Sequence, residues 1–248
     1  MTETSGRFRE TGAIHVWHGR VGDQTLPSDL LVLGDDELRL AGRASDLRAT
    51  HYAGVHAAVR RVLGSCYLGV SPADVRFGRH ACPRCADPGH GRPRIEHPVT
   101  ALDFSLSRSG PHWLLAVTAG EQVGVDIERC APDQVAEVAL TDDELDLMRR
   151  ADLPERRQEL FYRAWTRKEA VLKACGVGMV AELRDLETRP ADAGPVTVGY
   201  GEPGLAGRWY VRDLALGPGL VGALAQDAGR VRPVVIRQAE SLPGMWQL

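Results

Sequence analysis

Apolar residues recur with two different periods along this chain, and the periods separate its expected helices from its expected strands. Over residues 155–175 they recur every three to four positions, which predicts a long helix with Pro154 in its first turn and Gly176 and Gly178 at its end. Over residues 123–128 they alternate with Gly124, Asp126 and Glu128, the pattern of a strand. These two segments carry most of the chemistry.

The other periodic segments predict a mixed protein. A helix is expected over residues 45–63, with Ser45 as its cap. Its inward side chains would be Leu47, Val55, Val59 and Val62, and its outward ones Arg48, Arg60 and Arg61. Thr141 and Glu144 match a capping box at the start of a shorter helix. Expected strands cover residues 13–17, 75–79, 104–107, 113–117, 183–188, 196–200, 208–214 and 219–225.

Composition narrows the class of protein. The 248 residues, 44% of them hydrophobic, suffice for one large domain or two small lobes. The net charge of −3 argues against a nucleic-acid partner. The N-terminal residues have no apolar leader, and no apolar run approaches the roughly 18 residues that span a bilayer. Five cysteines indicate reduced thiols. We therefore expect a soluble cytoplasmic protein with no membrane partner.

The predicted strand and the long helix both carry paired charges. Asp126 and Glu128 leave the same face of the strand, where they repel one another unless a cation such as Mg²⁺ lies between them. On the helix, Glu169 and Lys173 lie four residues apart, as an ordinary surface ion pair also would. Lys168 projects into the apolar arc, which requires either an anion beside it or a stem that reaches water. The residues alone leave these alternatives open.

The motifs GVDIE, over residues 124–128, and WTRKEAVLKACG, over residues 165–176, resemble the paired signature of the two-lobed Sfp-type 4'-phosphopantetheinyl transferases. These enzymes transfer the phosphopantetheine arm of coenzyme A to a serine of a carrier protein, with Mg²⁺. The resemblance implies that Asp126, Glu128 and Glu169 hold the metal. It implies further that Lys168 and Lys173 face phosphates or the reacting centre, with Glu169 and Lys173 as the catalytic pair.

The N-terminal half extends the resemblance with residues that would bind coenzyme A. Arg48 lies on a helix that carries basic residues in relatives, and Arg92 replaces a lysine that often contacts phosphate. Ser107 and Arg108 match a segment in which Arg108 stands for the usual histidine. Arginine can keep a phosphate contact, but it cannot supply a neutral imidazole.

A loop over residues 80–94 contains a C-x-x-C pair. Cys82, Cys85 and His90 together could bind Zn²⁺, although a second spaced pair of ligands is missing. A loop with two free thiols is the alternative.

These observations together predict an α+β protein of two similar lobes, residues 1–118 and 119–248, with the active site in the cleft between them. The lobe duplication itself is not visible in the sequence. By the resemblance, the protein is a monomeric transferase that acts on coenzyme A and on acyl or peptidyl carrier domains of polyketide or nonribosomal peptide biosynthesis. The alternatives are a non-catalytic protein that binds coenzyme A or a carrier, and an interaction protein built around zinc.

Overall fold

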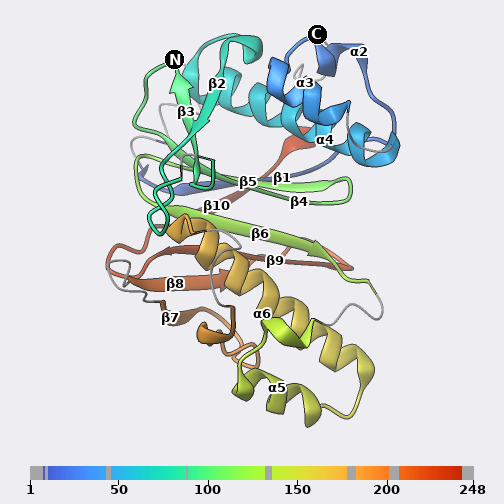
Figure 1. Ribbon diagram of the computed structural model, residues 1–248, viewed down its shortest axis with the longest axis vertical. Coiled ribbons are helices and arrows are strands. Elements are labelled where there is room, and N and C mark those ends of the chain that lie inside the picture. The colour runs from blue at the N-terminus through green and yellow to red at the C-terminus, as the bar shows by residue number, and fades with distance from the viewer. Residues whose placement is uncertain are drawn as a thin grey trace.

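A computed structural model describes Phe8 and residues 11–42, 46–87, 89–131, 136–177, 183–200 and 207–241. Its strands form two four-stranded sheets and one separate pair (Figure 1). The first sheet has the order β10 (Val234–Gln238), β1 (Ile14–Arg20), β5 (His112–Thr118), β4 (Asp103–Ser109). The second has the order β6 (Val123–Arg129), β9 (Leu220–Asp227), β8 (Gly207–Asp213), β7 (Val196–Tyr200). The pair is β2 (Arg76–Arg79) and β3 (Pro93–His97).

Five α-helices are numbered in the described part of the chain. They are α2 (Pro27–Leu30), α3 (Asp35–Ala41), α4 (Asp46–Arg61), α5 (Asp142–Arg149) and α6 (Pro154–Cys175). Helix α4 continues as a π-helix over Val62–Leu68, and short 3-10 helices cover Pro72–Asp74, Glu137–Ala139, Leu183–Asp185 and Ala239–Ser241. No helix in these described ranges is long and apolar enough to cross a membrane. Mixed helix and sheet confirm the expected α+β class.

Each large sheet is covered by one long helix (Figure 1). Val55, Val59 and Val62, at α4 and its extension, pack with Trp113 and Leu115 of the first sheet. Helix α6 lies against β6, β9 and β8, where its apolar arc meets side chains of the second sheet. The burial of these two apolar faces is the main favourable contribution to folding.

The faces of the two sheets that point away from the helices pack together. Val123, Val125 and Ile127 of β6 form one core with Leu114 and Ala116 of β5. Since side chains alternate along a strand, this packing directs Gly124, Asp126 and Glu128 to the opposite face, beneath α6.

Side-chain hydroxyls join β4 to β6 where the sheets meet. Three serines on alternate positions of β4 accept hydrogen bonds from three backbone N–H groups on alternate positions of β6. The pairs are Ser105 with Val125 at 3.1 Å, Ser107 with Ile127 at 3.3 Å and Ser109 with Arg129 at 3.0 Å. The free edge of β6 thus has its donors satisfied without a backbone ladder.

Most of the expected elements are confirmed, including the long helix, the strand at 123–128, the capping box and the β4–β5 hairpin. Residues 183–188 are not a strand, because Leu183–Asp185 forms a 3-10 helix. The parallel pairing of β10 with β1 joins the end of the chain to the first sheet across the predicted division at residue 118. Ser45 and Gly178 lie outside the described residues.

Three side chains of α4 lie on the side opposite to the one predicted. Leu47 is 52% exposed, whereas Arg60 and Arg61 are buried. The two guanidinium groups are paired with acids of earlier segments, Arg60 with Glu37 and Arg61 with Asp29, each at 2.6 Å. A buried arginine is tolerated when its charge is paired in this way.

Candidate active site

Helix α6 approaches β6 closely because β6 has a glycine at the crossing point. A Cβ atom on Gly124 would overlap the carbonyl oxygen of Ala170 and lie 2.6 Å from the backbone nitrogen of Ala174. Only glycine permits this contact between the two backbones. Glu169 and Lys173 directly precede the two contacting alanines on the same face of the helix, so the close approach places both near Asp126 of β6.

Asp126 is at the centre of the site. It is 3% exposed, and its Oδ1 accepts from the Lys173 ammonium at 2.6 Å and from the Ser107 hydroxyl at 2.7 Å. The same ammonium lies 2.9 Å from the Ser107 Oγ. Lys173 is therefore paired with Asp126 and not with Glu169, so the surface ion pair that the helix spacing allowed is not formed. The other carboxylate oxygen, Asp126 Oδ2, has no hydrogen-bond partner among the described residues.

Glu128 and Glu169 complete an acidic cluster around Asp126. Burial raises the pKa of Glu169, and the charges of Asp126 and Glu128 add to this effect against the opposing effect of Lys173. Burial likewise raises the pKa of Glu128, which Asp126 reinforces and a hydrogen bond from Ser109 opposes. Glu169 Oε1 is buried and finds no hydrogen-bond partner in the described ranges.

Two buried carboxylate oxygens without donors are an expensive arrangement, and a cation that met both would stabilise it. Oxygen ligands of this kind suit Mg²⁺. Even so, no group of three or more histidine, cysteine, aspartate or glutamate side chains within the described residues is already arranged to hold a metal ion. The predicted carboxylates thus fit a hard cation by their chemistry, while Lys173 partly neutralises them here. The positions of Cys82, Cys85 and His90 likewise give no support to the zinc predicted there.

A cavity of about 1120 Å³ adjoins this cluster, and Lys173 forms part of its wall. Its wall includes Arg92 and Lys173 among the predicted residues, together with Gly176 at the end of α6. It also includes three arginines that the sequence did not single out, Arg39, Arg76 and Arg79. These arginines lie on α3 and β2, which contribute to the wall of the same cavity as Leu172 and Lys173 of α6. The wall also includes four acids, and Arg39 pairs with one of them, Asp36, so basic and acidic side chains stand together in this cavity. The acids are Asp35, Asp36, Glu37 and Glu96.

Of the predicted residues of the N-terminal half, Arg92 belongs to the wall of this cavity, whereas Arg48 and Arg108 do not. Arg92 pairs with Asp103 and packs on Gly176. Arg108 points to the side of β4 opposite Ser107, and its guanidinium lies 5.3 Å from the centre of the Tyr52 ring on α4. Arg48 is exposed on α4, one turn before Tyr52.

Lys168 does not reach the acidic cluster. Its side chain is completely buried, and its ammonium pairs with Glu144 at 2.6 Å and donates to the carbonyl of Leu183 at 2.8 Å. The anion that the apolar surroundings of Lys168 require is therefore a residue of this chain. The predicted contact of Lys168 with phosphate is replaced by this internal ion pair, which links α5 to α6.

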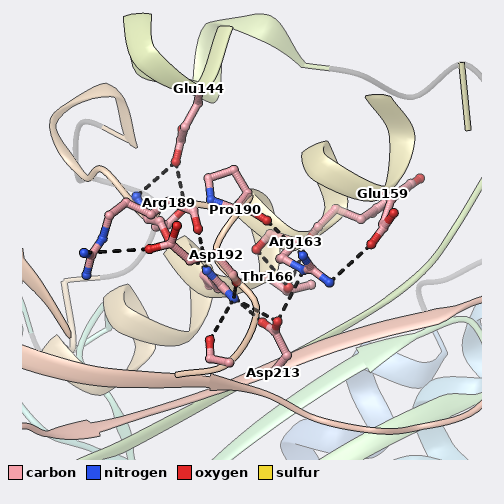
Figure 2. A network of polar contacts seen from close by, with 12 residues as sticks. Glu144, Glu159, Arg163, Thr166, Arg189, Pro190, Asp192 and Asp213 are labelled. Carbon is pink, nitrogen blue, oxygen red and sulfur yellow. Dashed lines mark hydrogen bonds and ion pairs between the residues drawn. The ribbon is translucent and has the colours of Figure 1, made fainter. Parts of the chain in front are cut away.

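This ion pair belongs to a network of polar contacts below α6, part of which is drawn in Figure 2. Glu144 also accepts from the backbone N–H of Thr188 at 3.1 Å and from its hydroxyl at 2.6 Å. In Figure 2, Arg163 reaches Glu159, Pro190 and Asp213. The buried guanidinium of Arg167 also pairs with Asp213, at 2.8 Å. The network fixes the segment before β7 to both helices.

Sequence comparisons match the same part of the chain. A model of the 4'-phosphopantetheinyl transferase superfamily matches residues 122–225, which include β6 and α6. The 4'-phosphopantetheinyl transferase HetI of Nostoc sp. is 32% identical over 185 residues, which are 70% of this chain and 73% of the relative. A 4'-phosphopantetheinyl transferase of Bacillus subtilis is 26% identical over 142 residues, 56% of this chain and 58% of the relative. The human L-aminoadipate-semialdehyde dehydrogenase-phosphopantetheinyl transferase is 29% identical over 115 residues, 43% of this chain and 36% of that protein.

Proposed function

Because the chain belongs to the 4'-phosphopantetheinyl transferase superfamily, we propose that it transfers the 4'-phosphopantetheine arm of coenzyme A to a serine of a carrier protein. The reaction depends on Mg²⁺ and releases 3',5'-ADP. The observation that carries this proposal is the cluster of Asp126, Glu128 and Glu169 with Lys173 in the wall of a cavity that arginines help to line. A site that only bound coenzyme A would have no need of three buried or half-buried carboxylates.

Mg²⁺, held by Asp126, Glu128 and Glu169, would neutralise the diphosphate of coenzyme A and the charge that develops on the departing oxygen. Glu169 takes the proton of the attacking serine hydroxyl, a role that suits a carboxylate whose pKa is raised by burial and by neighbouring charge. Lys173 is held by Asp126 and Ser107, so its ammonium is oriented to stabilise the leaving 3',5'-ADP.

The cavity would receive coenzyme A. Arg92, at the end of α6, and the newly identified Arg39, Arg76 and Arg79 would bind its phosphates. Arg48 and Arg108 flank Tyr52, so we assign them to the outer part of the same binding surface.

We also propose that residues 1–118 and 119–248 form two similar lobes around this cavity, with β10 returning to the first. In support, each half supplies one long helix and most or all of one four-stranded sheet: residues 1–118 give three strands of the first sheet, and residues 119–248 give all four of the second. We place the protein in the cytoplasm as a monomer that serves carrier domains of polyketide or nonribosomal peptide synthesis. Five free cysteines fit a reducing compartment.

Intact mass spectrometry of an apo carrier protein tests this function. Incubation with the protein, coenzyme A and Mg²⁺ should add the mass of one phosphopantetheine arm, and EDTA should abolish the gain. Glu169→Gln should reduce the rate roughly a hundred- to ten-thousandfold while the protein stays folded. Glu159→Gln, an exposed glutamate of the same helix, is the matched control and should keep full activity. An active Glu169→Gln variant would remove Glu169 from the mechanism, and coenzyme A binding without transfer would leave only a binding protein.

A further inference from the structure

The loop between β2 and β3 contains two cysteines whose use the proposed function does not require. Cys82 is buried and Cys85 is exposed, and both thiols are free. The loop is closed at its base by a backbone hydrogen bond from His80 to Arg92 at 2.9 Å. Within it, Ala86 donates to the carbonyl of Cys82 at 2.8 Å, which forms a tight turn around the C-x-x-C segment.

The turn also affects the acidity of Cys82. Burial raises the pKa of its thiol, but the backbone N–H groups of Cys85 and Arg84 outweigh this effect, so the pKa is lowered from its ordinary value. Because the hydrogen bond from Ala86 to Cys82 closes one turn, Cys82 and Cys85, three residues apart, have side chains on the same side of it. Backbone donors near a sulfur stabilise its thiolate.

An imidazole lies beside the exposed thiol. His90 Nδ1 is 3.5 Å from the sulfur of Cys85, and its Nε2 is 3.7 Å from a carboxylate oxygen of Asp87. A histidine between a thiol and a carboxylate can accept the thiol proton, which is the usual means of activating such a nucleophile. The other cysteines differ in the effect of burial, which is not outweighed there. Burial raises the pKa of Cys66 to about 11 and that of Cys175 to about 12, and it also raises the pKa of Cys130.

We propose that Cys82 and Cys85 are a redox-active dithiol that reacts with low-molecular-weight disulfides. Cys85, deprotonated by His90, attacks one sulfur of the external disulfide; a mixed disulfide forms and one thiolate leaves, which takes up a proton. Cys82 then attacks the sulfur of Cys85 and releases the second thiol. The external disulfide is reduced to two thiols, and the protein gains one intramolecular disulfide. A reduced thiol in excess reverses both steps.

The loop connects this dithiol to both cavities of the site. His80, Ala81 and Pro83 line a second cavity of about 470 Å³, while His90 and Gly91 line the large one. Arg92 belongs to the walls of both. A bond between the two sulfurs would fix the turn and shift His90 and Arg92, so oxidation should alter coenzyme A binding. This last consequence, unlike the dithiol itself, rests on the proposed function.

Peptide mass mapping in glutathione buffers tests the dithiol. As the proportion of oxidised glutathione rises, the peptide with both cysteines should become lighter by two hydrogen atoms, and reduced glutathione should reverse the change. Cys82→Ser should trap one glutathione on Cys85, because the resolving sulfur is gone. His90→Gln should slow the reaction without changing the final oxidised fraction. Cys130→Ser is the matched control and should behave as the unchanged protein. Two cysteines that stay fully alkylated in oxidised glutathione would overturn the proposal, as would stoichiometric zinc that protects them until it is chelated.

Calorimetric titration with coenzyme A tests the coupling. The oxidised form should bind roughly three- to tenfold more weakly than the reduced form, since small shifts of positioning groups have effects of this size or larger. Equal affinity of the two forms would overturn the coupling. Failure of the reduced form to bind coenzyme A would instead contradict the proposed function, and the disulfide mapping would stand unaffected.

Discussion

Helix α6 carries two lysines that each pair with a carboxylate at 2.6 Å, yet the surroundings of the two pairs are opposite. The pair of Lys168 and Glu144 is completely buried, and four further donors or acceptors on Leu183, Thr188 and Thr141 complete its hydrogen bonding. In the pair of Lys173 and Asp126, the lysine side chain is partly exposed. Beside it, Asp126 Oδ2 and Glu169 Oε1 have no hydrogen-bond partner among the described residues. Charged groups whose hydrogen bonds are all made within the protein stabilise the fold. Buried charged groups that lack hydrogen-bond partners instead indicate a site where a ligand supplies them.

Breaking the fully hydrogen-bonded pair of Lys168 and Glu144 should have the largest effect on stability. Glu144→Gln leaves the ammonium of Lys168 buried without a counter-charge, so we expect the free energy of unfolding to fall by about 3–5 kcal/mol. Urea denaturation followed by circular dichroism measures this. The double variant Glu144→Gln with Lys168→Met should recover most of the loss, because the unpaired charge is gone.

The exposed control is Glu159→Gln, which removes one carboxylate from surface pairs with Arg156 and Arg163 and should cost less than about 1 kcal/mol. If Glu144→Gln lowered the free energy of unfolding as little as Glu159→Gln does, the buried ion pair of Lys168 would not stabilise the fold more than a surface pair.

Protonation of His15 should break a second fully hydrogen-bonded cluster, which lies at the first sheet. The hydroxyl of Tyr67 accepts from Trp17 Nε1 at 2.7 Å and lies 2.8 Å from His15 Nδ1. Burial, with a contribution from Arg237, lowers the pKa of His15 from 6.5 to about 4. Above pH 6.5 the residue is neutral in both states and has no effect. Between these two values only the unfolded chain binds the proton, so stability should fall by about 3 kcal/mol as the pH is lowered.

Urea unfolding at a series of pH values between 7.5 and 4 checks the loss. His15→Asn keeps an acceptor for Tyr67 but cannot titrate, so the difference between the two proteins isolates His15 from the carboxylates. Parallel pH profiles for both would show that His15 contributes nothing.

The contact between α6 and β6 can be disturbed without changing any charge. Gly124→Ala would push a methyl group into the backbone of α6, which should cost about 1–3 kcal/mol in stability. The loss of transfer activity should be larger than this, because Glu169 and Lys173 move with the helix. Gly199→Ala on β7 is the control, since no atom of the described residues beyond its chain neighbours lies within 4 Å of the added Cβ. Equal activity of the two variants would mean that the site tolerates movement of α6.

These contrasts also explain which features the sequence could predict. The helix 154–175 and the strand 123–128 follow from local periodicity, and their motifs identified the carboxylates. The partner of Lys168 is 24 positions away on another helix. The acids that pair with the buried Arg60 and Arg61 belong to still earlier segments. Periodicity indicates which face of a helix or strand is apolar. It does not indicate which distant residue will pair with a buried charged side chain. The arginines of the cavity were missed for the same reason.

The smallest stability effect should have the opposite sign. Burial and the neighbouring charges raise the pKa of Glu169 above its ordinary value of 4.5, so its ionised form destabilises the fold once the pH exceeds that value. Glu169→Gln removes this charge, and at neutral pH its free energy of unfolding should lie within about 1 kcal/mol of the unchanged protein, on the stabilising side. Below pH 4.5 the two proteins should converge, because the glutamate is then protonated in both states. Urea unfolding at pH 7 and pH 4 measures both points. Since the same variant should be almost inactive, a stable but inactive protein would identify Glu169 as a residue kept for function at a cost to the fold. A loss as large as that of Glu144→Gln would instead make it a structural residue.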